Sequence, residues 1–242
     1  MYHVRDVFIP SESIQADMPT PNVVIIGEWD ASPVATETAA RWRYFDFLIK
    51  TAPKYNIATV LWDNGADHLD RATHQWRDPT ALALITNTTA GKANSLPDST
   101  TDGSATTQFS SAYVYHKVND SVTDAVLPYL FNGNTLSSIK NTKTGALLTK
   151  GTDYSSDSSA ITLTSKFLKT VLTSTTTGSL ANLTLTFSSG VPTTVDILQY
   201  ATPVLGSTSA KLPATSADFR IPITWKGQNR AYYPLPDDTS LF

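Results

Sequence analysis

A carboxylate follows the first apolar run of the chain. Glu28 comes directly after the β-branched run at residues 23–26, between Gly27 and Trp29. If that run is a strand of a parallel sheet, Glu28 lies at the C-terminal edge, where barrel and open-sheet enzymes hold their active sites. The alternative is an ordinary exposed glutamate that happens to follow a strand.

The next apolar run, residues 57–62, ends in a second group of functional side chains. Trp62 is followed by Asp63 and Asn64. An indole offers a flat apolar platform for the C–H face of a sugar ring, and amide and carboxylate groups can bind its hydroxyls. A core tryptophan before an Asn-Gly turn is the alternative. Two successive strand ends of this kind favour a functional edge.

The loop that follows holds imidazole and carboxylate groups at Asp67, His68, Asp70 and His74, with Trp76 beyond them. Their spacing matches no metal-site pattern, so we predict no metal here. A sugar-lining or structural role for His68 and Trp76 is the better interpretation. The chain has no Cys, no glycine-rich phosphate loop and no Gly-x-Ser-x-Gly motif, and therefore no cofactor is predicted.

These side chains need a scaffold, and the first 91 residues predict alternating strands and helices. The runs 23–26 and 57–62 are typical of strands buried on both faces. Between them we predict a helix capped by Ser32 and closed by Pro53. Asp78-Pro79 opens a second helix that ends near Gly91. The order predicts a parallel sheet in a barrel or an open doubly wound fold, although two strands are too few for either.

The composition changes after residue 91. Residues 92–111 are mostly small and polar, which predicts a flexible linker. From about 112 to 200 the apolar period becomes two, with turn signals such as Asn132-Gly133 and Ser189-Gly190, and this predicts a small all-β sandwich of immunoglobulin type. Residues 201–242 are either the start of a third β module, centred on 219–225, or an irregular tail.

The overall charge restricts the possible partners. The net charge is −3, and Lys and Arg are spread thinly, so we predict no nucleic-acid partner. No apolar stretch is long enough for a membrane helix, and the N-terminus lacks the features of a signal peptide, so no membrane association is predicted.

Four segments of the first part together resemble glycoside hydrolase family 5, in particular the C-terminal part of a fungal endo-β-1,4-glucanase. They are VIIGEW (24–29), RWRYFDF (41–47), TVLWDNG (59–65) and WRDP (76–79). The resemblance implies that residues 1–91 are a remnant of a (β/α)8 TIM barrel, and that Glu28 is the nucleophile of a retaining cellulase. It also implies that Trp62, with Trp29, Asn64 and His68, binds the β-glucan.

A retaining mechanism needs a second carboxyl group roughly 5 to 5.5 Å from the first. In this family the second group is a strand-end Glu after an Asn. The chain has only Glu12 and Glu37 besides Glu28, and neither follows a predicted strand. We therefore predict that the chain, although derived from a β-1,4-glucan hydrolase, is inactive as it stands.

Residues 112–200 resemble the immunoglobulin-like module that follows the barrel in many such enzymes, and 219–225 resembles the start of a carbohydrate-binding module of family 46. This resemblance supports an alternative function, a non-catalytic carbohydrate-binding or spacer protein. The aromatic residues that would line a binding face are Tyr113, Tyr115, Tyr129 and Tyr154. The family implies a secreted parent enzyme, and the oligomeric state stays open.

Overall fold

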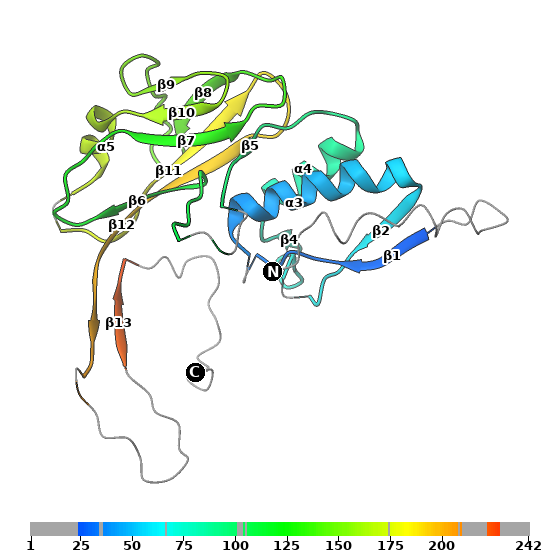
Figure 1. Cartoon of the computed structure of the whole chain (residues 1–242), viewed down its shortest axis with the longest axis horizontal. Coiled ribbons are helices and arrows are strands. Elements are labelled where there is room, and N and C mark those ends of the chain that lie inside the picture. The colour runs from blue at the N-terminus through cyan, green and yellow to red at the C-terminus, as the bar shows by residue number, and fades with distance from the viewer. Residues whose placement is uncertain are drawn as a thin grey trace, which may run out of the picture.

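The computed structural model describes residues 24–33, 36–65, 67–100, 104, 106–173, 175–207, 209 and 222–227. Figure 1 shows a helical layer beside a β-sandwich, with the end of the longest strand projecting from the sandwich. No helix among these residues has the length and hydrophobicity needed to cross a bilayer. The predicted helix cap at Ser32 and the predicted strands of the first part, apart from residue 23, fall within the described ranges.

The helical layer is built on one pair of strands. Strands β1 (Val24–Trp29) and β2 (Ile57–Leu61) pair in parallel, as the sequence predicts, with Ile26 opposite Thr59. The remaining elements of the layer are α3 (Thr38–Thr51), the 3-10 helix η1 (Ala52–Tyr55), α4 (Pro79–Thr89) and the short hairpin of β3 (Leu69–Asp70) and β4 (Gln75–Trp76). Helices α3 and α4 pack against each other (Figure 1).

The two helices differ in how well their starts were predicted. Helix α4 begins at Pro79 with Asp78 as its cap, which confirms the prediction. Helix α3 does not begin at Ser32, because Glu37 caps it instead and accepts from the backbone nitrogens of Ala39 and Ala40 at 2.8 Å. The Ser32 hydroxyl donates to Asp67 at 3.0 Å, so it is engaged elsewhere.

The predicted fold class, with a TIM-barrel remnant in residues 1–91, is wrong. In the described part of the chain the strands β1 and β2 form a separate two-stranded sheet, there are three α-helices, and most of the elements are strands that belong to other sheets. The two parallel strands are not buried on both faces, since Ile25 is 60% exposed and Val60 is 52% exposed. Apolar β-branched runs indicate strands, but they do not determine how many strands the sheet contains.

The sandwich consists of two sheets that face each other. One sheet has the order β5 (Leu96–Pro97), β7 (Ala125–Leu130), β10 (Ala160–Leu163), β9 (Tyr154–Ser156). The other has the order β13 (Ile223–Lys226), β12 (Thr193–Leu205), β11 (Gly178–Phe187), β8 (Leu136–Asn141), and β6 (Tyr113–Lys117) pairs in parallel with β12. Helix α5 (Ser165–Val171) follows β10.

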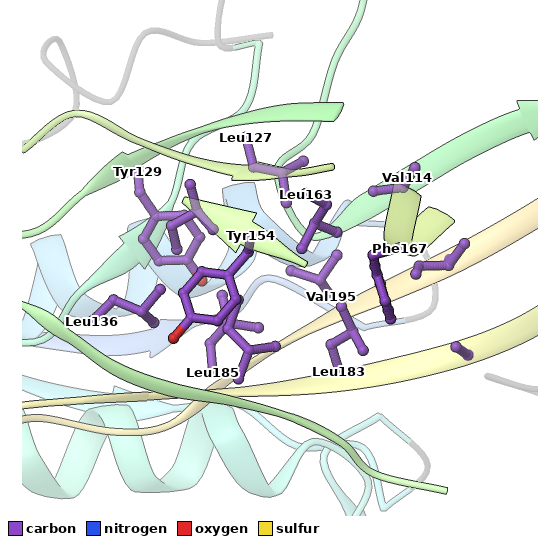
Figure 2. Close-up of a cluster of buried hydrophobic side chains, with 14 of the residues drawn as sticks. Val114, Leu127, Tyr129, Leu136, Tyr154, Leu163, Phe167, Leu183, Leu185 and Val195 are labelled. Carbon is purple, nitrogen blue, oxygen red and sulfur yellow. The ribbon is translucent and has the colours of Figure 1, made fainter. Parts of the chain in front are cut away.

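Alternation along the strands fills the space between the sheets. In β11, Leu183 and Leu185 are buried while Thr184 between them is partly exposed. Figure 2 shows these leucines facing Leu127 and Leu163 of the opposite sheet. Burying a side chain of this size contributes roughly 1.5–3 kcal/mol relative to leaving it exposed. This core holds the sandwich together in a chain without cysteine.

The start of the predicted linker is part of the folded structure. Residues 96–97 form β5, which pairs with β7, and Leu96 packs in the core of the helical layer together with Val191 of the sandwich. Asn94 is fully buried and donates to Asp46 of α3 at 2.9 Å, while its side-chain oxygen accepts from the Val191 nitrogen at 3.2 Å. Polar composition predicted a tether, but these polar groups hydrogen-bond within the protein. The predicted domain boundaries stay a prediction.

Strand β12 extends beyond the sandwich. Its residues after 200 pair with β13, from Ala201 opposite Lys226 to Leu205 opposite Ile223. Residues 202–205 are exposed, as are those of β13. Of the region predicted as a third module or a tail, residues 208, 210–221 and 228–242 lie outside the described residues.

Candidate functional site

The predicted strand-end residues lie along one edge of the β1–β2 pair. Glu28 is exposed on β1. Trp62 follows β2, its backbone nitrogen donates to the Trp29 carbonyl at 2.9 Å, and its indole is 45% exposed. Asn64 is exposed and holds a loop, because its side chain both donates to the Asp67 carboxylate and accepts from the Asp67 nitrogen at 3.0 Å. Trp62 is therefore the one large apolar platform in this predicted set that is exposed.

Two other members of that set lie in the interior. Trp29 is buried and meets Phe45 edge-on at 5.2 Å between ring centroids. His68 is 1% exposed, and its Nε2 lies 2.5 Å from Asp30. Both side chains pack the helical layer here. The predicted sugar contacts of this set and the predicted nucleophilic role of Glu28 stay predictions.

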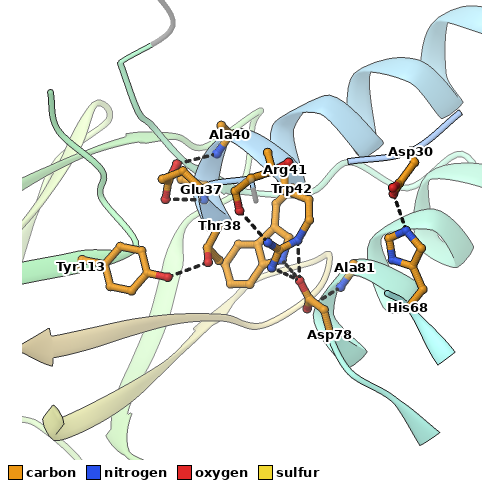
Figure 3. A network of polar contacts seen from close by, with 12 residues as sticks. Asp30, Glu37, Thr38, Ala40, Arg41, Trp42, His68, Asp78, Ala81 and Tyr113 are labelled. Carbon is orange, nitrogen blue, oxygen red and sulfur yellow. Dashed lines mark hydrogen bonds and ion pairs between the residues drawn. The ribbon is translucent and has the colours of Figure 1, made fainter. Parts of the chain in front are cut away.

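A buried polar network fixes α3 against the loop before α4 (Figure 3). The guanidinium of Arg41 donates to Asp78 Oδ2 from Nε at 3.0 Å and from Nη2 at 2.5 Å, and the Trp42 indole donates to the same oxygen at 2.8 Å. Asp78 Oδ1 accepts from the Ala81 nitrogen at 3.0 Å as the cap of α4. The Asp78 carboxylate thus accepts hydrogen bonds both from side chains of α3 and from the backbone at the start of α4.

The same end of α3 contacts the sandwich. The Thr38 hydroxyl and the Tyr113 hydroxyl lie 2.7 Å apart, and the Ser110 hydroxyl donates to Glu37 at 2.6 Å. An ion pair joins Arg43 and Asp98. Figure 3 shows Tyr113 reaching from the sandwich to Thr38. These contacts place strand β6 beside the helical layer.

A groove of about 460 Å³ lies where the two layers meet. Its exposed walls are aromatic: Tyr115 is 61% exposed, Trp225 is 54% exposed and Tyr200 is 39% exposed. The rings of Tyr113 and Tyr115 stack with centroids 5.5 Å apart. The groove is lined by Pro33, Thr36, Thr38, Tyr113, Tyr115, Leu198, Tyr200, Ala201, Pro203, Trp225, Lys226 and Gly227.

The groove can bind a neutral ligand with an apolar face and hydroxyl groups. Of the described residues that line it, Lys226 alone is charged. Desolvation by the surrounding protein raises the pKa of Tyr113 and raises that of Tyr115 to about 12, so both phenols stay protonated at neutral pH. Ring faces can stack on sugar C–H surfaces, while the phenol and threonine hydroxyls can exchange hydrogen bonds with sugar hydroxyls.

Two of the four aromatic side chains that line this groove were predicted from the sequence. Tyr113 and Tyr115 were among the predicted aromatic candidates, but Tyr129 and Tyr154 are each only 3% exposed and belong to the core. Strand alternation alone does not tell the core face from the outer face. Tyr200 and Trp225 were not predicted as groove residues. The pairing of β12 with β13 brings them together, and local sequence does not indicate that pairing. Among the described residues, no cluster of His, Asp and Glu is arranged to hold a metal ion.

Comparisons with known proteins show what the sandwich is similar to. Residues 108–197 match the family model of the carbohydrate binding domain X2. The chain is 27% identical over 213 residues, 86% of its length, to endoglucanase B of Paenibacillus lautus, of which it covers 34%.

Two solved structures match the fold of most of the chain. A tri-modular family 5 endo-β-1,4-glucanase from Bacillus licheniformis, complexed with cellotetraose, matches 84% of the chain at 30% identity with a TM-score of 0.69, and the chain covers 37% of it. The tri-modular endo-β-1,4-glucanase B of Bacillus halodurans also matches 84% of the chain, at 26% identity with a TM-score of 0.68, and the chain covers 35% of it. The chain thus spans about a third of the length of these relatives.

These findings correct the predicted identity of the chain. The relatives are bacterial, so the fungal assignment is wrong. The prediction that the chain is an O-glycosyl hydrolase is also wrong, because the family match is to a carbohydrate-binding domain and not to a catalytic one. Residues 108–197 are thus similar to a carbohydrate-binding domain, and the chain resembles parts of multimodular family 5 endoglucanases.

Proposed function

We propose that this chain is a non-catalytic carbohydrate-binding protein, with a spacer role within a longer extracellular polypeptide, and that its ligand is a β-glucan. The observation that carries the proposal is the groove with three exposed aromatic side chains, which borders a domain of carbohydrate-binding type. An exposed aromatic cluster is costly to keep in water unless a ligand covers it.

The chemistry of the groove favours a neutral polysaccharide over other polymers. Tyr115 and Trp225 line it with largely exposed aromatic rings, and Thr36 and Thr38 of the helical layer add hydroxyl groups to its lining. A single lysine among the lining residues cannot neutralise a polyanion, so a nucleic acid or an acidic glycan does not fit. The relatives are endo-β-1,4-glucanases, one of them complexed with cellotetraose, which supports β-1,4-glucan as the ligand.

The edge of the β1–β2 pair is a second candidate surface within the same function. Trp62 is 45% exposed there, and Asn64 lies close by in sequence. Only one aromatic side chain of the predicted set is exposed at this edge, whereas the groove offers three. We therefore assign the main binding surface to the groove.

The test is affinity electrophoresis and titration calorimetry on the full chain with soluble β-1,4-glucan. We expect Tyr115→Ala and Trp225→Ala each to weaken binding about tenfold, equivalent to roughly 1.4 kcal/mol. Trp62→Ala tests the strand edge, since it removes an aromatic side chain of similar exposure outside the groove, and Phe47→Ala, at an exposed position of α3, is the matched control that should leave binding unchanged. Loss of binding in Trp62→Ala with none in Tyr115→Ala or Trp225→Ala would assign the ligand to the strand edge. No binding by the unmodified chain would refute the proposal.

A further inference from the structure

A second hollow, of about 350 Å³, adjoins the groove. Tyr113 and Tyr115 belong to the walls of both. The second hollow continues over the segment 108–111 and over residues 122–127, which lead into β7. Both volumes fall in the range of about 300–1,000 Å³ that is typical of small-molecule sites. The two hollows are therefore neighbours that share one aromatic wall.

The wall itself is an open edge of a sheet. The Asp196 nitrogen donates to the Ala112 carbonyl, and the Val118 nitrogen donates to the Tyr200 carbonyl, so the even-numbered residues of β6 direct their backbone groups toward β12. Since these directions alternate along a strand, the backbone N–H and C=O of Tyr115 point away from β12. No other described strand pairs with this edge. It offers a donor and an acceptor beside the exposed ring.

The apolar surface continues past this edge. Phe109 is 45% exposed and Val126 is 62% exposed, and both line the second hollow but not the groove. Besides the shared tyrosines, the titratable groups among the described residues of the second hollow are His116 and Asp124, and Asp124 accepts from the Ser165 nitrogen at 2.6 Å. Aromatic surface with few charges thus extends from Trp225, across Tyr115, to Phe109.

We propose that one linear β-glucan chain occupies both hollows and crosses the ring of Tyr115 between them. This inference rests on the proposed function and adds the length of ligand that is recognised. A disaccharide can fill only one hollow. A longer chain gains the contacts of the second hollow without a second loss of translational and rotational freedom, and therefore binds more tightly.

The test compares cellobiose, cellotetraose and cellohexaose by titration calorimetry on the full chain. We expect the unmodified chain to bind cellohexaose at least tenfold more tightly than cellobiose. Phe109→Ala should weaken cellohexaose binding about fivefold and change cellobiose binding by less than twofold. Tyr200→Ala, which alters the groove alone, should weaken both ligands by similar factors.

Val126→Arg provides a second variant that does not depend on Phe109. The position is 62% exposed on a strand, so the arginine side chain can be accommodated by the fold while it obstructs the second hollow. It should reproduce the Phe109→Ala result. Phe47→Ala, an aromatic truncation on the exposed side of α3, is the matched control and should change neither affinity.

The outcomes separate this inference from the proposed function. Equal affinity for cellobiose and cellohexaose, or no effect of both Phe109→Ala and Val126→Arg on cellohexaose, would overturn the two-hollow proposal and leave carbohydrate binding in place. Absence of binding for all three oligosaccharides and for polymeric β-glucan would instead overturn the proposed function.

Discussion

Asp78→Ala is the substitution whose cost the structure defines best. Asp78 is 8% exposed, and its carboxylate accepts from Arg41, from the Trp42 indole and from the Ala81 nitrogen. Truncation leaves the Arg41 guanidinium, itself 2% exposed, without its counter-charge. Removing one partner of a buried ion pair costs about 3–5 kcal/mol, and losing a helix cap costs about 1 kcal/mol.

The loss of the ion pair and the loss of the helix cap arise from the same carboxylate and are not additive. We therefore expect a loss of about 4 kcal/mol in the free energy of unfolding. A chain of this size loses about 2–4 °C in Tm per kcal/mol, which predicts a Tm lower by about 8–16 °C. The assay is thermal unfolding followed by far-UV circular dichroism, with tryptophan fluorescence to report on the helical layer, where Trp42 lies.

Asp70→Ala is the matched control. Asp70 forms a more exposed ion pair with Arg77 at 3.6 Å, and solvent-exposed pairs contribute little to stability. The double variant Arg41→Met with Asp78→Ala should recover most of the lost stability, because it removes the unpaired buried charge. A loss below about 2 kcal/mol for Asp78→Ala, or no recovery in the double variant, would refute the reasoning.

Two further predictions concern β13 and a turn of the sandwich. Gly227 has φ +92°, and an added Cβ would lie 2.4 Å from the Gln199 carbonyl oxygen, so Gly227→Ala should displace β13 and weaken oligosaccharide binding about tenfold. Gly133→Ala, with φ +85° and open space around it, should leave binding unchanged, and equal affinities of the two variants in calorimetry would contradict this role. Hydrogen bonds from the nitrogen and hydroxyl of Ser159, and then from the Ala160 nitrogen, hold the pKa of Asp157 below its usual range. A lowered folded-state pKa stabilises the fold above the unfolded pKa of about 3.9, and this contribution is lost as the pH falls through the folded value. Asp157→Asn should therefore lower Tm at pH 7 and converge with the unmodified chain near pH 2; an equal difference in Tm at both pH values in melting curves would rule this out.

Local signals predicted the elements better than their assembly. The pair Asp78-Pro79 locates the start of α4, because capping depends on a few adjacent residues. Period-two alternation locates β10 and β11, because it too is a signal carried by a few adjacent residues. The start of α3 was misplaced since two polar residues, Ser32 and Glu37, compete as caps, and only the contact of Ser32 with Asp67 excludes the first.

The burial and the partners of a side chain depend on the whole fold, and these were predicted less well from the sequence. Trp29 and His68 come after predicted strands as Trp62 does, yet they are buried: Trp29 packs edge-on against Phe45 of α3, and His68, in the loop after β2, contacts Phe45 and pairs with Asp30. Asn94 belongs to a stretch whose composition is typical of a linker. Its partners lie 48 residues before it and 97 residues after it, which composition cannot indicate.

The junction of the helical layer and the sandwich has a consequence for binding thermodynamics. Thr38 and Tyr113, one from each layer, are hydrogen-bonded to each other and also line the groove, and the cores meet where Leu96 and Val191 pack together. These contacts fix the two walls of the groove relative to each other without a ligand. A ligand that enters need not spend binding free energy to bring them together, and it should associate with little loss of protein conformational entropy.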